Sequence, residues 1–286
     1  MNETLLADSG STKTEWRLVR PDQPIIAIHT DGLNPYFQDE DQLRQTLQTQ
    51  LLTQLPPLPH PVSVYFYGTG CTGPESNGRI ARAIQKTIHC TATIDVASDM
   101  LGAARAVAGR EPGIVCILGT GSNACFFDGY QITTPSYSLG FWLGDEGSGG
   151  NLGKRLVTAF LHGKLPPELH RIFSDQYGLD RLTVLDHAYN QPYPNRYFAR
   201  FAPFLYEHQQ VEFIRELVLS AFTDFLQLYI CRLPDYHKHP IHFIGSVAYY
   251  FADWLRELLV KEHLQPGRFI QVPIEGLVAF HAKAGS

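Results

Sequence analysis

Two segments of this chain share one pattern: an apolar strand, a short turn of small and hydroxylated residues, and a second strand. The first is LLADSGSTKTEWRLV at residues 5–19, and the second is IVCILGTGSNACFF at residues 114–127. When the two are aligned, Asp8-Ser9-Gly10-Ser11 falls on Gly119-Thr120-Gly121-Ser122. Because each copy opens a segment of domain size, the repeat predicts a duplicated architecture with two hairpin turns facing each other. A chance similarity between two glycine turns is the alternative.

The rest of the chain alternates strand and helix signals. Residues 62–70 and 93–99 are typical of strands, and leucines at steps of four predict a helix over residues 40–55. Residues 211–231 predict a long helix with one apolar face, which we expect to be core. That face contains Ile214, Leu217, Val218, Ala221, Phe222, Phe225 and Leu228. With 286 residues, 44% of them hydrophobic, the chain can bury the core of one large domain or of two ordinary ones.

Charge and cysteine usage exclude several classes of function. The net charge is -5 and no basic run occurs, so nucleic acid and acidic membrane surfaces are poor candidate partners. No stretch reaches the roughly 18 apolar residues of a membrane span, and we expect a cytoplasmic protein. The five cysteines form no C-x-x-C pair, which favours reduced thiols over an iron–sulfur or zinc site.

The first turn has the chemistry of a phosphate-binding loop. Backbone N–H groups in a tight turn can converge on an anion, Thr12 and Thr14 add hydroxyl donors, and Lys13 adds positive charge. The turn is not a Walker loop, because a strand follows it where that motif needs a helix. Asp8 would repel phosphates unless a cation such as Mg²⁺ lay between them. A plain hairpin with a capping aspartate is the alternative.

Two further stretches carry carboxylates at places where ligands bind. Asp99 lies between a predicted strand and a predicted helix, so it is either a helix N-cap or a general base at the carboxyl end of the strand. Residues 140–153, GFWLGDEGSGGNLG, combine glycines with Trp142, Asp145 and Glu146. Such a segment suits a polyhydroxylated ligand, and it equally suits a helix N-terminus led by Asp145, Glu146 and Ser148.

Taken in order, the motifs resemble the actin-like sugar kinases, and within them the N-acetylglucosamine kinase branch of the BadF/BadG/BcrA/BcrD ATPase family. The matching pieces span residues 7–248: ADSGSTKTEW, TDGLNP, YGTGC, SDMLGAA, ILGTGSN, GDEGSGG and IGSVA. Each piece is weak by itself, but the ordered set is specific. The chain departs from the family in its first loop, where the usual D-G-G is Asp8-Ser9-Gly10.

The resemblance implies an α/β fold of two ribonuclease-H-like (actin-like ATPase) domains with a cleft between them. We expect an N-terminal domain over residues 1–108, completed by a C-terminal helix at residues 273–286. A second domain with helical additions would then cover residues 109–272. ATP and a sugar would bind in the cleft.

The resemblance also implies roles for individual residues. It assigns ATP binding to Ser11, Thr12, Lys13, Gly119, Thr120, Gly121, Ser122, Gly245 and Ser246, with Asp8 near the magnesium ion. It assigns sugar binding to Asn34, Asp99, Phe141, Trp142, Leu143 and Asp145. Asp99 matches the catalytic aspartate of the family, which favours the general base over the N-cap.

The expected activity is ATP-dependent phosphorylation of an amino sugar, N-acetylglucosamine at its 6-hydroxyl being the first candidate, by a homodimer such as the family commonly forms. Related acceptors are N-acetylmuramic acid and glucosamine. One alternative is an ATPase that drives conformational change in a partner protein, against which the absence of the activators' glycine-framed cysteine pattern counts. Another is a sensor without turnover.

Overall fold

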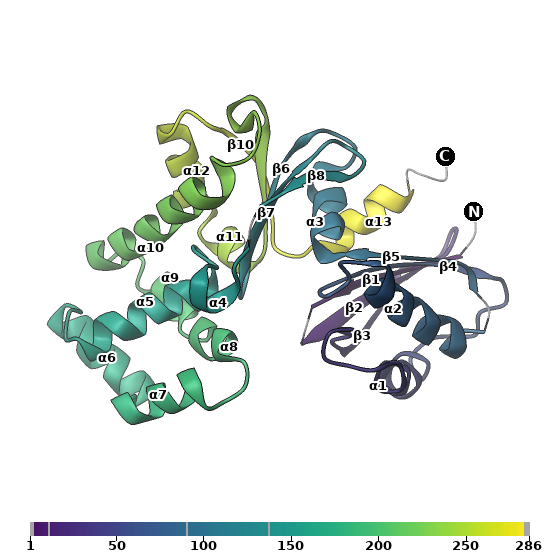
Figure 1. The fold of residues 1–286 in the computed structure, drawn as a ribbon, viewed down its shortest axis with the longest axis horizontal. Coiled ribbons are helices and arrows are strands. Elements are labelled where there is room, and N and C mark those ends of the chain that lie inside the picture. The colour runs from purple at the N-terminus through teal and green to yellow at the C-terminus, as the bar shows by residue number, and fades with distance from the viewer. Residues whose placement is uncertain (1–2, 11, 90, 137, 283–286) are drawn as a thin grey trace. The chain divides into compact units, whose positions relative to one another are not determined.

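The computed structural model describes residues 3–10, 12–89, 91–136 and 138–282. The chain forms two compact units. The N-terminal unit comprises Met1–Arg110, Gly129–Gln131 and Val272–Ser286, and the C-terminal unit comprises Glu111–Asp128 and Ile132–Gln271. Each unit is built on its own five-stranded sheet (Figure 1).

The sheet of the N-terminal unit has the strand order β3-β2-β1-β4-β5. Its strands are β1 (Glu3–Ser9), β2 (Lys13–Val19), β3 (Ile26–Asp31), β4 (Val62–Gly68) and β5 (Thr91–Ser98). β1 pairs antiparallel with β2 across the first turn and parallel with β4. The carboxyl ends of β1, β4 and β5 therefore meet at one edge, where ligands of α/β proteins bind.

Four α-helices cover this sheet: α1 (Glu40–Thr46), which a π-helix (Leu47–Leu51) continues, α2 (Pro74–Thr87), α3 (Asp99–Ala108) and α13 (Ile274–Ala282). The predicted helix over residues 40–55 thus forms in most of its length. Asp39 begins it with a capping box, because its side chain accepts from Gln42 N while the Gln42 side chain accepts from the Asp39 N–H. Although α13 is the last helix, it packs beside α3 (Figure 1).

The sheet of the C-terminal unit repeats the first in topology, with the order β10-β9-β6-β7-β8. Its strands are β6 (Gly113–Leu118), β7 (Ser122–Phe127), β8 (Ile132–Pro135), β9 (Pro240–Ile244) and β10 (Gln265–Ile270). As in the other unit, the first two strands form a hairpin, and β6 pairs parallel with β9. The predicted duplication of the sheet topology is confirmed, and with it the α/β class of two ribonuclease-H-like units; that the two turns face each other stays a prediction.

The helices of the C-terminal unit form a larger apolar core with its sheet. They are α4 (Gly140–Leu143), α5 (Gly149–Leu161), α6 (Pro167–Tyr177), α7 (Arg181–Tyr189), α8 (Pro194–Ala199), α9 (Ala202–Glu207), α10 (Glu212–Phe225) with a π-helix (Leu226–Ile230), α11 (Ser246–Tyr250) and α12 (Ala252–Lys261). No helix in the described part of the chain has both the length and the apolar character that crossing a membrane requires.

One expectation about the core is wrong. Ile214, Val218 and Phe225 are buried as predicted, but Leu228 is 50% exposed. Leu228 lies in the π-helix, whose wider turn rotates later residues away from the face that an α-helical period predicts. Tyr229 and Ile230 are buried instead.

Candidate active site

The first turn is held by hydrogen bonds that involve Ser9, the residue that departs from the family pattern. The hydroxyl of Ser9 is buried, lies 2.7 Å from Thr14 Oγ1 and accepts a hydrogen bond from Leu33 N at 3.1 Å. Gly10 N donates to Lys13 O at 3.0 Å and closes the hairpin. The side chain of Ser9 therefore points into the unit, ties the turn to the segment before Asn34, and leaves the face of the turn free of a bulky group.

The expected phosphate ligands of this turn differ in what they contact. Ser11 lies outside the described residues. Thr12 and Lys13 are exposed, as phosphate ligands must be before ATP binds, and the Lys13 ammonium lies 2.7 Å from Glu15 Oε1. A triphosphate would have to compete with Glu15 for this ammonium.

Asp8 lies at the end of β1, opposite Glu15 on β2 and Tyr67 on β4. Burial raises the pKa of the Asp8 carboxyl from 3.8 to about 7; the nearby charges of Asp99 and Glu15 add to the rise, and Lys13 opposes it. A carboxylate that is costly to ionise and is surrounded by other carboxylates suits a divalent cation. No group of three His, Cys, Asp or Glu side chains among the described residues could hold a metal, so Mg²⁺ at Asp8 would need phosphate oxygens and water as further ligands.

Asp99 is the first residue of α3, but it does not cap the helix. Ser98 is the N-cap, because its hydroxyl accepts from Leu101 N at 3.2 Å. The Asp99 carboxylate instead accepts from Thr69 Oγ1 at 2.7 Å through Oδ2, and from Met100 N at 2.8 Å through Oδ1. The N-cap alternative for Asp99 is thereby removed.

Asn34 lies beside the loop that carries Thr69. Its side chain is buried, and its Oδ1 accepts from Tyr36 N at 2.9 Å. Gly70 has φ +85°, and a Cβ on it would lie 2.5 Å from Asn34 Oδ1. Only glycine allows this approach, which brings Asn34 to the residue next to Thr69.

A cavity of about 410 Å³ in the N-terminal unit begins at the two residues after Asn34. It is lined by Pro35, Tyr36, Thr72, Gly73, Pro74, Glu75, Ser76 and Arg79. Among them, Tyr36 Oη and Thr72 Oγ1 lie 2.6 Å apart, and Arg79 donates to Pro35 O at 2.6 Å. The cavity thus offers hydroxyls and a fixed guanidinium beside Asn34.

The second turn rests on the first residues of α5. Gly119 N donates to Gly121 O at 3.0 Å within the turn, Gly149 N donates to Gly119 O at 2.8 Å, and Gly150 N donates to Thr120 O at 3.0 Å. Ser148 is the N-cap of α5, since its hydroxyl accepts from Asn151 N at 3.1 Å. The helix-start alternative for residues 140–153 is therefore correct for Ser148.

Asp145 contacts the same turn. It is buried with φ +59°, and its Oδ1 accepts from Ser122 N at 3.2 Å, while its own N–H donates to Tyr229 Oη at 2.9 Å. Burial raises the pKa of Asp145, and the hydrogen bond from Ser122 opposes that rise. The GDEGSGG segment therefore both supports the second turn and begins α5.

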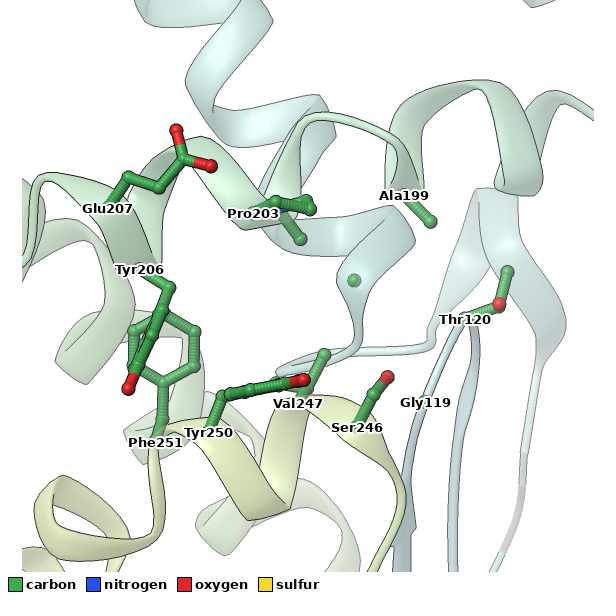
Figure 2. A pocket seen from close by; sticks show the side chains of 12 residues that line it. Gly119, Thr120, Ala199, Pro203, Tyr206, Glu207, Ser246, Val247, Tyr250 and Phe251 are labelled. Atoms are coloured by element: carbon green, nitrogen blue, oxygen red, sulfur yellow. The ribbon is translucent and has the colours of Figure 1, made fainter. Parts of the chain in front are cut away.

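A cavity of about 390 Å³ lies beside the second turn, and Figure 2 shows the side chains that line it. It is lined by Gly119, Thr120, Gly149, Ala199, Ala202, Pro203, Tyr206, Glu207, Ser246, Val247, Tyr250 and Phe251. Gly245, which precedes Ser246, has φ +119°, and a Cβ there would lie 2.3 Å from Leu118 O. Three predicted ATP-binding residues, Gly119, Thr120 and Ser246, therefore line one cavity, whose other walls are mostly apolar and aromatic, as in nucleoside sites.

Neither a family profile nor a curated protein matches the chain. Among solved structures, the chain is 37% identical to a protein from Porphyromonas gingivalis that bears the provisional name N-acetylglucosamine kinase. The match covers 99% of this chain and 100% of that one, with a TM-score of 0.92. The chain belongs to this N-acetylglucosamine kinase-like family.

More distant structures share the fold of this family member. A protein from Chromobacterium violaceum with the same provisional name is 21% identical, with a TM-score of 0.75 over 98% of this chain and 99% of that one. A ROK family glucokinase from Streptomyces griseus, solved with glucose and AMPPNP, is 12% identical, with a TM-score of 0.52 over 99% of each chain. At these identities the likeness shows the actin-like ATPase fold alone.

The predicted sugar-lining residues Phe141, Trp142 and Leu143 of this kinase-like protein form α4. The Phe141 ring stacks on Phe198 at 5.6 Å between centroids, and its carbonyl accepts from Lys154 Nζ at 3.2 Å. Trp142 and Leu143 are exposed. Phe141 therefore anchors α4. The Trp142 ring stacks on Tyr189 at 5.7 Å between centroids, with its outer surface exposed to solvent.

Several residues of the two sites carry no sequence signal. Tyr206 and Glu207 reach the cavity beside the second turn from α9, and Tyr250 reaches it from α11. Thr69 was present in the YGTGC motif, but nothing in that motif indicated that its hydroxyl contacts Asp99. Tyr206, Glu207 and Tyr250 belong to no short pattern, because helix packing decides what lines the cavity.

Proposed function

We propose that this chain transfers the γ-phosphoryl group of ATP to the 6-hydroxyl of N-acetylglucosamine. Its family makes the chain an ATP-dependent sugar kinase. What we propose beyond this is the identity of the acceptor sugar and the hydroxyl that is phosphorylated. The relative from Porphyromonas gingivalis, 37% identical over nearly the whole chain, supports N-acetylglucosamine through its provisional name.

The observation that carries the proposal is the state of Asp99. The Asp99 carboxylate lies at the carboxyl end of β5 and is not the N-cap of α3. Each of its oxygens accepts one hydrogen bond, from Thr69 or from Met100, so lone pairs remain with which it can act as a general base. Asn34 lies close by, next to Gly70, and can bind a sugar hydroxyl with its amide. The N-terminal unit thus offers a base and a sugar ligand on neighbouring loops.

The proposed reaction is an in-line displacement. Asp99 accepts the proton of the sugar hydroxyl while that oxygen forms a bond to the γ-phosphorus and the bond from phosphorus to the leaving ADP oxygen breaks. Backbone N–H groups of the turns position the phosphates and balance their charge. Mg²⁺, when bound near Asp8, would supply further positive charge against the phosphate oxygens. Positioning should account for most of the rate.

The cavity beside Tyr36 supports a second acceptor. Its volume of about 410 Å³ exceeds what an acetamido group needs, and it contains the Arg79 guanidinium. Arginine binds carboxylates well, so the lactyl carboxylate of N-acetylmuramic acid could bind there, although Glu75 lies 3.6 Å from Arg79 and reduces the net charge.

The test is ADP release measured over a panel of amino sugars at saturating MgATP, with the phosphorylated position of each product read by NMR. We expect release that depends on N-acetylglucosamine and a 6-phosphate product. Asp99→Asn should lower kcat by about a hundredfold or more and leave the binding of ATP and sugar nearly unchanged. ATP hydrolysis that no sugar stimulates would contradict the proposal and favour the partner-driving ATPase. Light scattering would test the homodimer that we also propose.

A further inference from the structure

Thr69 joins the first turn to the candidate base. Its backbone N–H donates to Ser9 O at 2.9 Å, next to Asp8, and its hydroxyl donates to Asp99 Oδ2 at 2.7 Å. One residue at the end of β4 therefore contacts both the loop expected to bind phosphate and the carboxylate expected to take the proton. None of the family expectations assigns a role to this side chain.

The distance between Thr69 and Asp99 is set by a close approach of α3 to β4. Gly102, one turn after Asp99, lies so near Tyr67 that a Cβ would be 2.7 Å from the Tyr67 Cβ. The Tyr67 hydroxyl accepts from Arg105 Nη1, also on α3, at 2.7 Å and lies 2.8 Å from His281 Nε2 on α13. Gly102 and Arg105 thus hold α3 against Tyr67 of β4, which lies two residues before Thr69.

The hydrogen bond from Thr69 leaves lone pairs of the Asp99 carboxylate available to a substrate. A carboxylate has about four lone-pair positions. Thr69 occupies one on Oδ2, and the backbone N–H of Met100 occupies one on Oδ1. The remaining positions can accept the proton of a sugar hydroxyl, and the two bonds stop the carboxylate from rotating.

We infer that Thr69 is a positioning residue, which holds Asp99 in the rotamer that accepts the proton from the acceptor sugar. The inference rests on the proposed function, since it assigns a role to Thr69 through the base of that reaction. Thr69 need not touch either substrate. Its removal should slow the chemical step and spare binding.

The first test compares Thr69→Val, which keeps the shape and removes the hydroxyl, with Thr69→Ser, which keeps the hydroxyl. A misdirected catalytic group costs about ten- to a hundredfold in rate. We therefore expect kcat to fall about tenfold or more in Thr69→Val, with KM for sugar and for ATP within about threefold of wild type. Thr69→Ser should stay within about threefold of wild type in kcat. A rise in KM at unchanged kcat would overturn the inference.

The second test is a double-mutant cycle with Asp99→Asn. If Thr69 acts through Asp99, Thr69→Val should cause little further loss of kcat in the Asp99→Asn background, because residues that act as a unit are not additive. A structural role would lower kcat by the same factor in both backgrounds and would overturn the inference. Thermal unfolding of every variant checks the fold, and Thr69→Ala replaces Thr69→Val if the latter fails to fold.

The two proposals fail in different ways. Wild-type protein that releases no ADP with any amino sugar overturns the proposed function, and the role of Thr69 with it. Wild-type turnover that depends on sugar, combined with full activity of Thr69→Val, overturns the role of Thr69 alone.

Discussion

The carboxylate of Asp145 accepts a hydrogen bond from the backbone N–H of Ser122 at 3.2 Å. Asp145 begins the approach to α5, whereas Ser122 begins β7, so this bond fastens a glycine turn to a segment that follows it in the chain. The turn needs this support, because Gly119 and Gly121 by themselves impose little conformational restriction. Asp145 consequently has a role in shaping the second turn besides the sugar contact that the family resemblance implies for it.

Asp145 variants separate these two roles. Asp145→Asn retains an oxygen that can accept from Ser122 N, so we expect KM for ATP to stay within about threefold of wild type and KM for the sugar to rise about tenfold, the cost of weakening one charged hydrogen bond. Asp145→Ala removes the acceptor as well, and both KM values should rise. Steady-state kinetics with each substrate varied provides the measurement. An unchanged KM for the sugar in Asp145→Asn would argue against a sugar contact.

Gly245 should tolerate no side chain. Its φ is +119°, and an added Cβ would lie 2.3 Å from Leu118 O. The backbone beside the cavity of the second turn would therefore have to move to accept a side chain. We expect Gly245→Ala to lose about 2 kcal/mol or more of unfolding free energy and to bind ATP weakly.

Gly163→Ala is the control for Gly245→Ala, because Gly163 also has a positive φ, +63°, but nothing lies within 4 Å of its added Cβ. The control should cost about 1–2 kcal/mol, because it has the left-handed backbone without the clash. Denaturant unfolding and ATP titration measure the two effects, and equal losses in both variants would contradict the steric explanation.

Asp8 should make the metal-free protein less stable as the pH rises. Its pKa of about 7 in the folded protein lies above the ordinary 3.8. Between these values the folded chain keeps a proton that the unfolded chain has lost, so the free energy of unfolding falls as the pH rises from about 4 to 7. Asp8→Asn removes this titration. In EDTA at pH 8 we expect the variant to unfold at a higher temperature than wild type, and at pH 4 the difference should close.

The same Asp8→Asn variant should lose its dependence on Mg²⁺ together with most of its activity. Thermal scans in the presence of ATP, with and without Mg²⁺, would show this, since the ion should stabilise wild type more than the variant. A variant that Mg²⁺ stabilises as much as wild type would place the ion elsewhere.

His281 should destabilise the folded chain in acid. Burial, together with the charges of Arg105 and Arg110, lowers its pKa from 6.5 to about 4. The unfolded chain then binds a proton that the folded chain does not, so stability falls as the pH drops from about 6.5 to 4. His281→Gln keeps an acceptor for the Tyr67 hydroxyl and should flatten part of this decline. Burial also lowers the pKa of His242 to about 4, so part of the loss of stability in acid should remain in His281→Gln.

Thermal scans from pH 4 to 7 measure how steeply the stability of each variant changes with pH, with exposed His162→Gln as the control. Equal slopes in wild type and His281→Gln would refute the prediction about His281.

The sequence alone determined the features that depend on near neighbours. Apolar strands joined by turns such as Asp8-Ser9-Gly10 predicted two sheets of like topology, because strand pairing across a short turn depends on residues a few positions apart. The helix over residues 40–55 and the long helix after Val211 were predicted for the same reason, since the apolar spacing of a helix involves residues three or four positions apart. The ordered motifs also predicted the family, since each motif is a short string.

Only the tertiary structure decided which of these residues act together. Whether Asp99 is a helix cap or is available as a base could be decided only from the positions of Ser98 and Thr69. The cavity beside the second turn forms only because α9 and α11 pack there. The exposure of Leu228 required a π-helix that no residue pattern signals. Hydrogen bonds and cavities form between residues far apart in the chain, and their geometry is set by how whole helices and sheets pack, which local periodicity does not contain.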